Sequence, residues 1–241
     1  MRVRVRCLLR VLTMACSCLA LGGCPVRAPP AGPAPAAAST AHAGVPYEVA
    51  AAESLLSIRV YRAGTLAAAG HNHLIASHGL EGAFYLPRDP LGATFEVRFA
   101  VDSLTVDEAP LRAALHSADF PPDVPDSARE GTRRNMLSAA LLDGANHPQI
   151  VLRAVGLQEQ APPVAGAVLA QVAVSVRDAE HEITLPVRWQ RAHGTLTVDA
   201  ETTLRQSELG LKPFSALLGA LQVRDEMQVS LHLVAHERAT P

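Results

Sequence analysis

Three histidines in a short stretch are the first residues of this chain that could do chemistry. His71 and His73 lie two residues apart in a Gly-His-Asn-His run, and His78 follows five residues after His73. On a strand, residues two apart share a face, so these imidazoles could ligate a metal ion together, with His78 as a third ligand. No carboxylate lies close by in the sequence, and a polar loop at the rim of the fold explains the same residues. We favour the loop over the metal site.

A second use of these side chains is to bind the polar head of a ligand. A neutral imidazole at the mouth of a cavity can hydrogen-bond a carbonyl group. The polar residues that we place at such a mouth are His71, Asn72, His73, Arg205 and Gln206. Alternatively, Arg205 and Ser207 fasten their loop to Asp225 and Glu226, and we favour this structural role because a half-buried arginine usually needs an acidic partner.

The sequence contains no recognisable catalytic set. It lacks the G-x-S-x-G of a nucleophile elbow, the H-E-x-x-H of a zinc peptidase and a glycine-rich phosphate loop. His181-Glu182 has no second histidine at the spacing that a zinc peptidase needs. We therefore expect a protein that is not an enzyme and requires no cofactor.

The beginning of the chain has the architecture of a secretory signal. Four arginines precede a short apolar stretch, residues 11–21, and Leu-Gly-Gly-Cys follows, ending at Cys24. The apolar stretch is shorter than the roughly 20 residues that span a bilayer. The run resembles the lipobox of a bacterial lipoprotein, which implies a signal peptide over residues 1–23 and acylation of Cys24. Because Pro25 follows the cysteine instead of Asp, we expect a periplasmic domain anchored to the outer membrane of a Gram-negative bacterium.

The composition indicates a linker followed by one folded domain. Residues 24–46 are rich in Pro and Ala and cannot build a core, so they form a semi-extended linker of about 3.1 Å per residue. Residues 47–237 are long enough for one domain. Removal of the signal leaves 17 basic and 23 acidic residues, a net charge of −6, which argues against a nucleic-acid partner. It also leaves no cysteine beyond Cys24, so a disulfide scaffold is excluded.

Apolar and polar residues alternate with a period of two along much of this domain, and this pattern predicts an all-β fold. Phe95, Val97 and Phe99 share one face, for example, while Glu96 and Arg98 take the other. Similar runs give about eight strands with one dry and one wet face, which is the antiparallel pattern. Long strands such as residues 195–205 favour a closed eight-stranded barrel over a sandwich. The predicted strands cover residues 56–60, 80–86, 95–101, 149–155, 168–177, 183–189, 195–205 and 227–233.

One or two short helices complete the prediction. Ser127 and Glu130 fit a capping box, so a helix should run from there to about Leu142, with Gly144 as its stop. Its apolar residues, Met136, Leu137, Ala140 and Leu141, would close one end of the barrel. A second helical turn is expected within residues 214–221.

Four segments of the domain resemble the YceI-like family of periplasmic lipid-binding barrels. The strongest is L-R-Q-S-E-L-G-L-K-P-F-S-A-L-L-G-A-L-Q-V-R-D-E-M, residues 204–227; the others are G-H-N-H at 70–73, V-D-S-L at 101–104 and N-H-P-Q-I-V-L-R-A at 146–154. The chain departs from the family where most members carry a His-Gly hairpin before the strand that here holds Trp189. The resemblance implies a lipocalin-like eight-stranded antiparallel barrel that holds a long isoprenoid, such as a quinone or polyprenyl chain.

If the barrel holds such a ligand, the inward-facing side chains of its strands line a tunnel for it. An eight-stranded barrel is just wide enough to be filled by side chains or to hold one slim ligand. The residues expected to line the tunnel are Phe95, Val97, Phe99, Leu185, Val187, Trp189, Leu196, Val198, Val229 and Leu231. Two alternatives stay open: a metal- or redox-linked accessory protein that uses His71 and His73, and a docking lipoprotein whose barrel is filled. The oligomeric state is not predicted.

Overall fold

The computed structural model describes residues 43–238. The expected signal peptide, Cys24 and most of the expected linker lie outside the described residues. The first strand, β1 (Val45–Val49), begins within the last two residues of the segment that we assigned to the linker. The strand pairings of the barrel all lie within the described residues, which share one hydrophobic core. These residues therefore form one domain with the core that a domain needs to fold on its own.

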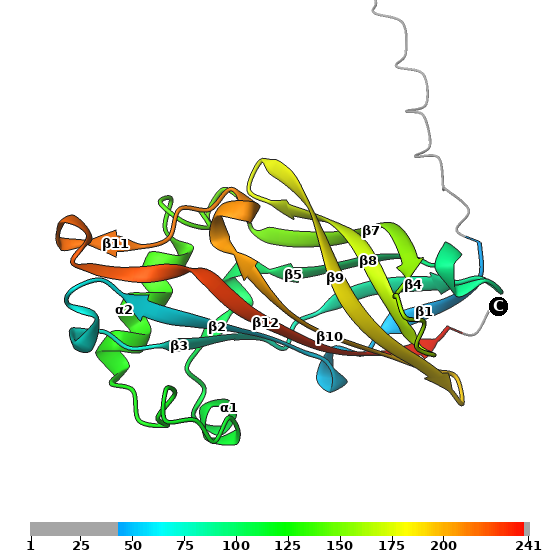
Figure 1. Ribbon diagram of the computed structural model, residues 1–241, viewed down its shortest axis with the longest axis horizontal. Helices are drawn as coiled ribbons and strands as arrows, with labels where there is room; N and C mark the ends of the chain where they lie inside the picture. Colours follow the sequence, from blue (N-terminus) through cyan, green and yellow to red (C-terminus); the bar gives the residue numbers. More distant parts are fainter. Residues whose placement is uncertain (1–42, 239–241) are drawn as a thin grey trace, which may run out of the picture. The chain divides into compact units, whose positions relative to one another are not determined.

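Eight antiparallel strands form a closed barrel (Figure 1). The circuit runs β1, β4, β5, β7, β8, β9, β10, β12 and back to β1. Its strands beyond β1 are β4 (Glu81–Leu86), β5 (Thr94–Ala100), β7 (Gln149–Glu159), β8 (Ala167–Val176), β9 (Ala179–Ala192), β10 (Thr195–Arg205) and β12 (Leu221–Glu237). Strands that follow one another in sequence often pair in the barrel. A two-residue turn, His193-Gly194, joins β9 to β10, and both residues have the positive φ that such a hairpin requires. The predicted fold class is thus confirmed.

The barrel has two different halves, because β12 changes its partner along its length. Its last residues pair with β1, whereas its first part pairs with β2 (Leu55–Ala63). β2 in turn pairs with β3 (His73–Ser77), and β3 with the short β6 (Thr105–Val106). A small strand, β11 (Ser215–Ala216), pairs with the beginning of β12. We call the two ends of the barrel the β1 end and the β11 end.

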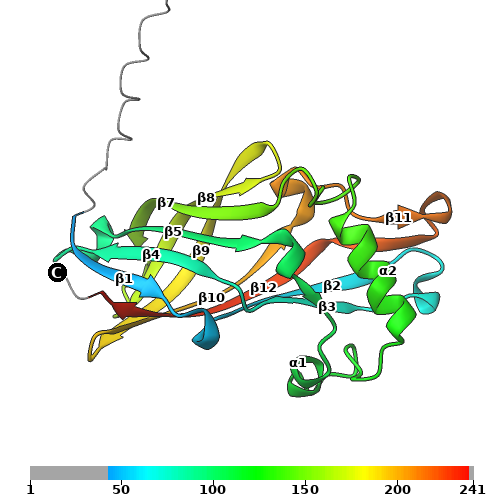
Figure 2. The ribbon, with the colours of Figure 1, turned by 180° about the vertical axis from the view of Figure 1, so that it is seen from behind.

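Two α-helices lie beside the half at the β11 end (Figure 2). They are α1 (Ala109–Ala114) and α2 (Asp126–Leu137). β3 and β6 do not pair with β5 within residues 43–238, and α2 contacts β6 along this unpaired edge. Short 3-10 turns complete the connections: Ala51–Glu53, Ala67–Ala69, Pro90–Gly92, Val101–Ser103, Gln206–Leu209 and Leu217–Gly219. None of the helices between residues 43 and 238 is long and apolar enough to cross a membrane.

The predicted helix is present but is shorter than expected. It starts after Pro125, and no side chain caps it, so Ser127 lies in its first turn and not at its N-cap. It ends at Leu137, because Ser138 adopts an extended conformation. The second predicted helical turn is the 3-10 turn Leu217–Gly219. Helix α1 and the strands β1, β3, β6 and β11 were not predicted. They are short, and β3 is buried along its whole length, so alternation of apolar and polar residues gives no signal there.

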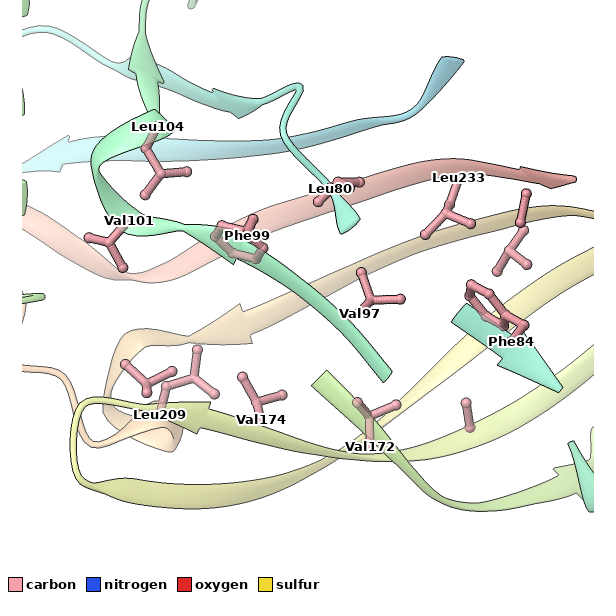
Figure 3. Close-up of a cluster of buried hydrophobic side chains, with 14 of the residues drawn as sticks. Leu80, Phe84, Val97, Phe99, Val101, Leu104, Val172, Val174, Leu209 and Leu233 are labelled. Atoms are coloured by element: carbon pink, nitrogen blue, oxygen red, sulfur yellow. The ribbon is translucent and has the colours of Figure 1, made fainter. Parts of the chain in front are cut away.

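A cluster of buried hydrophobic side chains runs through the barrel and includes residues of the β1 half and of the cavity wall (Figure 3). Tyr47, Leu80 and Leu233 are almost completely buried, and Phe84 packs against Phe95 with ring centroids 5.2 Å apart. Val97, Val172 and Leu233 project between the strands in Figure 3. The aromatic rings are bulky, so this half of the barrel is a packed core.

Candidate binding cavity

The half at the β11 end contains a cavity of about 460 Å³. Aliphatic side chains from the inward faces of the strands form most of its wall. These include Leu56 and Ile58 of β2, Leu152 of β7, Ile183 of β9 and Leu231 of β12. Helix α2 forms the cavity wall on the side where the sheet edge is unpaired. It contributes Gly131 from its middle and Met136 from its last turn. Such a mostly apolar cavity is of the size that holds small organic ligands.

The structure divides the ten residues that we expected to line a tunnel into two sets. Four of them line the cavity: Phe99, Leu185, Val229 and Leu231. The other six do not line this cavity: Phe95, Val97, Val187, Trp189, Leu196 and Val198. Alternation identifies the inward face of a strand but does not tell where along the barrel a cavity lies.

A polar cluster borders the cavity beside α2. His73 lines the cavity, and its Nδ1 lies 2.6 Å from Oδ2 of Asp107, whose side chain is completely buried. Oδ1 of Asp107 accepts hydrogen bonds from the backbone N–H of Leu74 at 2.8 Å and from Nη1 of Arg112 at 2.5 Å. Nε2 of His73 lies 3.0 Å from the hydroxyl of Thr132, another residue of the cavity wall. We call His73, Asp107, Arg112 and Thr132 the His73 cluster.

Arg112 ties this cluster to the surrounding loops. Its side chain is only 1% exposed, and its Nε donates to the carbonyl of Pro121 at 2.7 Å. Its Nη1 also donates to the carbonyl of Asn72 at 2.9 Å. A buried guanidinium needs such partners, because it stays charged and has no water around it. Arg112 thus positions the carboxylate that in turn orients His73.

The environment of Asp107 lowers the pKa of its carboxyl below the ordinary value. Burial by itself raises this pKa, but hydrogen bonds from His73 and from the backbone of Leu74, with the charges of His73 and Arg112, outweigh burial. Asp107 is therefore a carboxylate at neutral pH, and it fixes the proton of the His73 ring on the nitrogen that faces it.

We expect Asp107→Asn to lower the free energy of unfolding by about 3 kcal/mol at neutral pH, because it leaves buried Arg112 without its counter-ion. A carboxyl with a lowered pKa stabilises the fold above its unfolded-state value, about 4, and this contribution is lost as the pH falls through its folded-state value. The difference between wild type and variant should therefore shrink below about pH 4. Urea unfolding at several pH values measures this difference, with the exposed Asp123→Asn as control. A difference that stays constant down to pH 3 would contradict the assignment.

The other polar candidates lie in different places. His71 lines the cavity, with its ring centroid 6.0 Å from that of His73. Asn72 accepts from the backbone N–H of Arg62 and donates to the carbonyl of Asp119, so it ties loops together. His78 follows the far end of β3 and lies 3.1 Å from a carboxylate oxygen of Glu108.

Gln206 and Arg205 also separate from each other. Gln206 lines the cavity, but its Nε2 donates to the carbonyl of Arg224 at 2.8 Å. Arg205 does not line the cavity and lies 3.8 Å from Glu226 at the surface. Ser207 contacts Asp225 through both its backbone N–H and its hydroxyl, which lowers the pKa of the Asp225 carboxyl. These contacts fasten the loop to Asp225 and Glu226, as the structural interpretation predicts, and of Arg205 and Gln206 only Gln206 lines the cavity.

The histidines do not form the three-ligand metal site considered above. His73 and His78 stand at opposite ends of β3, and both ring nitrogens of His73 already have partners. No group of three or more His, Cys, Asp or Glu within residues 43–238 is arranged to hold a metal ion.

The His73 cluster has a connectivity that resembles that of a nucleophile, base and acid. Thr132 contacts His73, which contacts Asp107. Thr132 lies inside α2, however, where the backbone N–H groups bond the preceding turn and cannot stabilise an oxyanion. The arrangement is suited to presenting polar atoms to a ligand in the cavity. Sequence reasoning missed Asp107, Arg112 and Thr132, because they are 34, 39 and 59 residues from His73 and no local pattern connects them.

A closed eight-stranded barrel with an apolar cavity in one half is the architecture of barrels that bind apolar ligands. The family model of the YceI-like domain matches residues 47–235, which is most of the chain. The chain belongs to the YceI-like family, whose members share a lipid-binding barrel fold and are binding proteins rather than enzymes.

A solved structure agrees with this fold. BcnA of Burkholderia cenocepacia is 15% identical, with a TM-score of 0.54 over 80% of this chain and 99% of that chain. The YceI protein of Campylobacter jejuni is 6% identical, with a TM-score of 0.42 over 61% of this chain and 73% of that one. The search of curated proteins found no match.

Proposed function

We propose that this protein binds or carries a long isoprenoid-type lipid, a quinone or a polyprenyl compound, in the periplasm. The observation that carries the proposal is the cavity of about 460 Å³ at the β11 end, whose wall is mostly aliphatic. An isoprenoid chain is slim and apolar, so it gains free energy by leaving water for such a wall. The packed β1 half closes the other end, which leaves one end of the barrel for the ligand to enter and leave.

The His73 cluster supports a ligand with a polar head. Thr132 and His73 present polar atoms to the cavity while Asp107 and Arg112 hold them in place from behind. His71 lies next to His73 on the same wall. One or two polar groups in an otherwise apolar cavity fix the orientation of a ligand. We place the head of the lipid here and its chain along the aliphatic strands.

The anchor and the compartment belong to the same proposal. The lipobox-like Leu-Gly-Gly-Cys supports acylation of Cys24, with the tether holding the barrel at the outer membrane of a Gram-negative bacterium. The partners in this proposal are the membrane, through the anchor, and the apolar lipid. No cofactor is required for such a role.

The experiment that tests the function starts from residues 43–241, expressed in the periplasm without the anchor. We expect organic extraction of the purified, folded domain to release about one isoprenoid per protein molecule, identified by mass spectrometry. A metal scan of the same sample distinguishes the alternative that rests on His71 and His73. A folded domain that is empty and also fails to take up added quinone would contradict the proposal.

The position of the head is tested by His71→Leu, which removes one polar group from the wall. Affinity for a long-chain quinone should fall about threefold to tenfold, the effect of one hydrogen bond. Affinity for squalene, an isoprenoid hydrocarbon without a polar head, should stay the same or rise. Equal losses for both ligands would show that His71 contributes packing and does not contact the head.

A further inference from the structure

The hairpin between β11 and β12 ends in two exposed leucines. Leu217 is 66% exposed and Leu218 is fully exposed. Of the five large apolar side chains that are exposed within residues 43–238, these two and Leu66 lie at the β11 end. The backbone N–H of Leu66 donates to the carbonyl of Ala220 at 2.8 Å, so its loop lies against the hairpin. We call Leu66, Leu217 and Leu218 the apolar tip.

The backbone holds these leucines outward in an unfavourable conformation. Leu217 and Leu218 have φ values of 51° and 56°, in the left-handed region that residues other than Gly, Asn and Asp seldom adopt. Two consecutive leucines at such positions contribute nothing to the core. Strained positions of this kind concentrate at sites of function.

The charged residues of the two segments that carry the apolar tip are all basic. These segments, residues 61–72 and 211–224, contain Arg62, Lys212 and Arg224 and no acidic residue. Arg62 is held by the carbonyl of Gly70 at 2.7 Å, and the guanidinium of Arg224 lies 5.7 Å from the centre of the Tyr61 ring. Asp225, which follows the second segment, is bonded to Ser207. The two segments are thus basic on a chain whose overall charge is negative.

We propose that the apolar tip inserts into the surface of an anionic lipid bilayer and brings the cavity against the membrane. Exposed leucines with basic neighbours are the combination that binds to membrane surfaces. The same segments line the cavity, through Ala69, Phe214 and Leu221. A second copy of this chain is a poorer partner, because a symmetric contact would bring the basic residues of both copies together. The purpose of docking, exchange of lipid, rests on the proposed function, but the docking itself does not.

Flotation of residues 43–241 with lipid vesicles tests the proposal. We expect binding to vesicles of phosphatidylglycerol and phosphatidylethanolamine, weaker binding at high salt, and little binding to phosphatidylcholine alone. The double variant Leu217→Asn, Leu218→Asn should lose at least about tenfold in partitioning. Asn accepts the left-handed conformation, so the thermal stability of the variant should be equal to or above that of wild type.

Val164→Asn is the matched control, because Val164 is 54% exposed in the loop before β8, at the β1 end. It should bind vesicles as wild type does. Wild-type protein that fails to bind the anionic vesicles would overturn the proposal, and so would undiminished binding by the Leu217, Leu218 variant. Leucine-dependent dimers without vesicle binding would assign the tip to a second copy instead. Because no isoprenoid is added, the result is independent of the ligand-extraction experiment.

Discussion

Replacement of Thr202 by Trp is expected to abolish lipid binding without unfolding the barrel. Thr202 lies on β10 with its side chain in the wall of the cavity. An indole ring at this position occupies space that the ligand needs, and the cavity can accept it where a packed core could not. We expect affinity for a long-chain quinone to fall by at least about 100-fold, equivalent to about 3 kcal/mol.

The neighbouring residue provides the control for this substitution. Thr203 is the next residue of β10 and is exposed on the outer face of the barrel. Thr203→Trp adds the same ring on the same strand and should leave affinity unchanged. Fluorescence titration with quinone, together with circular dichroism of both variants, measures the effect. If a folded Thr202→Trp variant binds as tightly as wild type, the ligand does not occupy this cavity.

Removal of Arg112 is expected to cause the largest loss of stability among single substitutions in the His73 cluster. Arg112→Ala leaves the buried carboxylate of Asp107 without its cation and two carbonyl groups without their donor. Breaking a buried ion pair in this way costs about 3–5 kcal/mol. For a domain of this size, each kcal/mol lowers the melting temperature by about 2–4 °C. We therefore expect a decrease of about 6–20 °C.

A surface pair with similar geometry gives the comparison for Arg112. Nε of Arg153 lies 2.9 Å from a carboxylate oxygen of Glu96, but both side chains are nearly half exposed. Arg153→Ala should cost no more than about 1 kcal/mol, because water screens this pair. Adding Asp107→Asn to Arg112→Ala should recover part of the loss, since the uncompensated charge is then removed. Equal effects of the Arg112 and Arg153 substitutions would show that the Asp107–Arg112 pair is not buried in solution.

The effect on ligand binding separates the two roles of the cluster. Arg112 does not line the cavity, so it acts on a ligand only through Asp107 and the orientation of His73. The Thr202 and Arg112 substitutions therefore test different parts of the proposal: the first tests where the ligand lies, and the second tests what holds the polar wall of its site in place.

The class of the fold follows from the pattern of apolar and polar residues along the chain. Apolar and polar residues alternate over strands such as Thr195–Arg205, which indicates one buried and one exposed face. This pattern is local, because successive side chains of a strand always point to opposite faces of the sheet. The run from Leu204 to Met227 carried the family resemblance, which the match over residues 47–235 confirms. The predicted inward face of β5 is also found in the structure, since Val97 and Phe99 are both buried.

The position of the cavity along the barrel, and the residues that meet there, depend on how distant parts of the chain pack together. Val97 and Phe99 hold equivalent inward positions in the alternation of β5, yet only Phe99 lines the cavity, while Val97 is buried in the core. The His73 cluster joins β3 to α2 and to the loop of Asp107 across long stretches of chain. Such contacts depend on how strands close around a common axis, and that closure is a property of the whole sheet that no local pattern encodes.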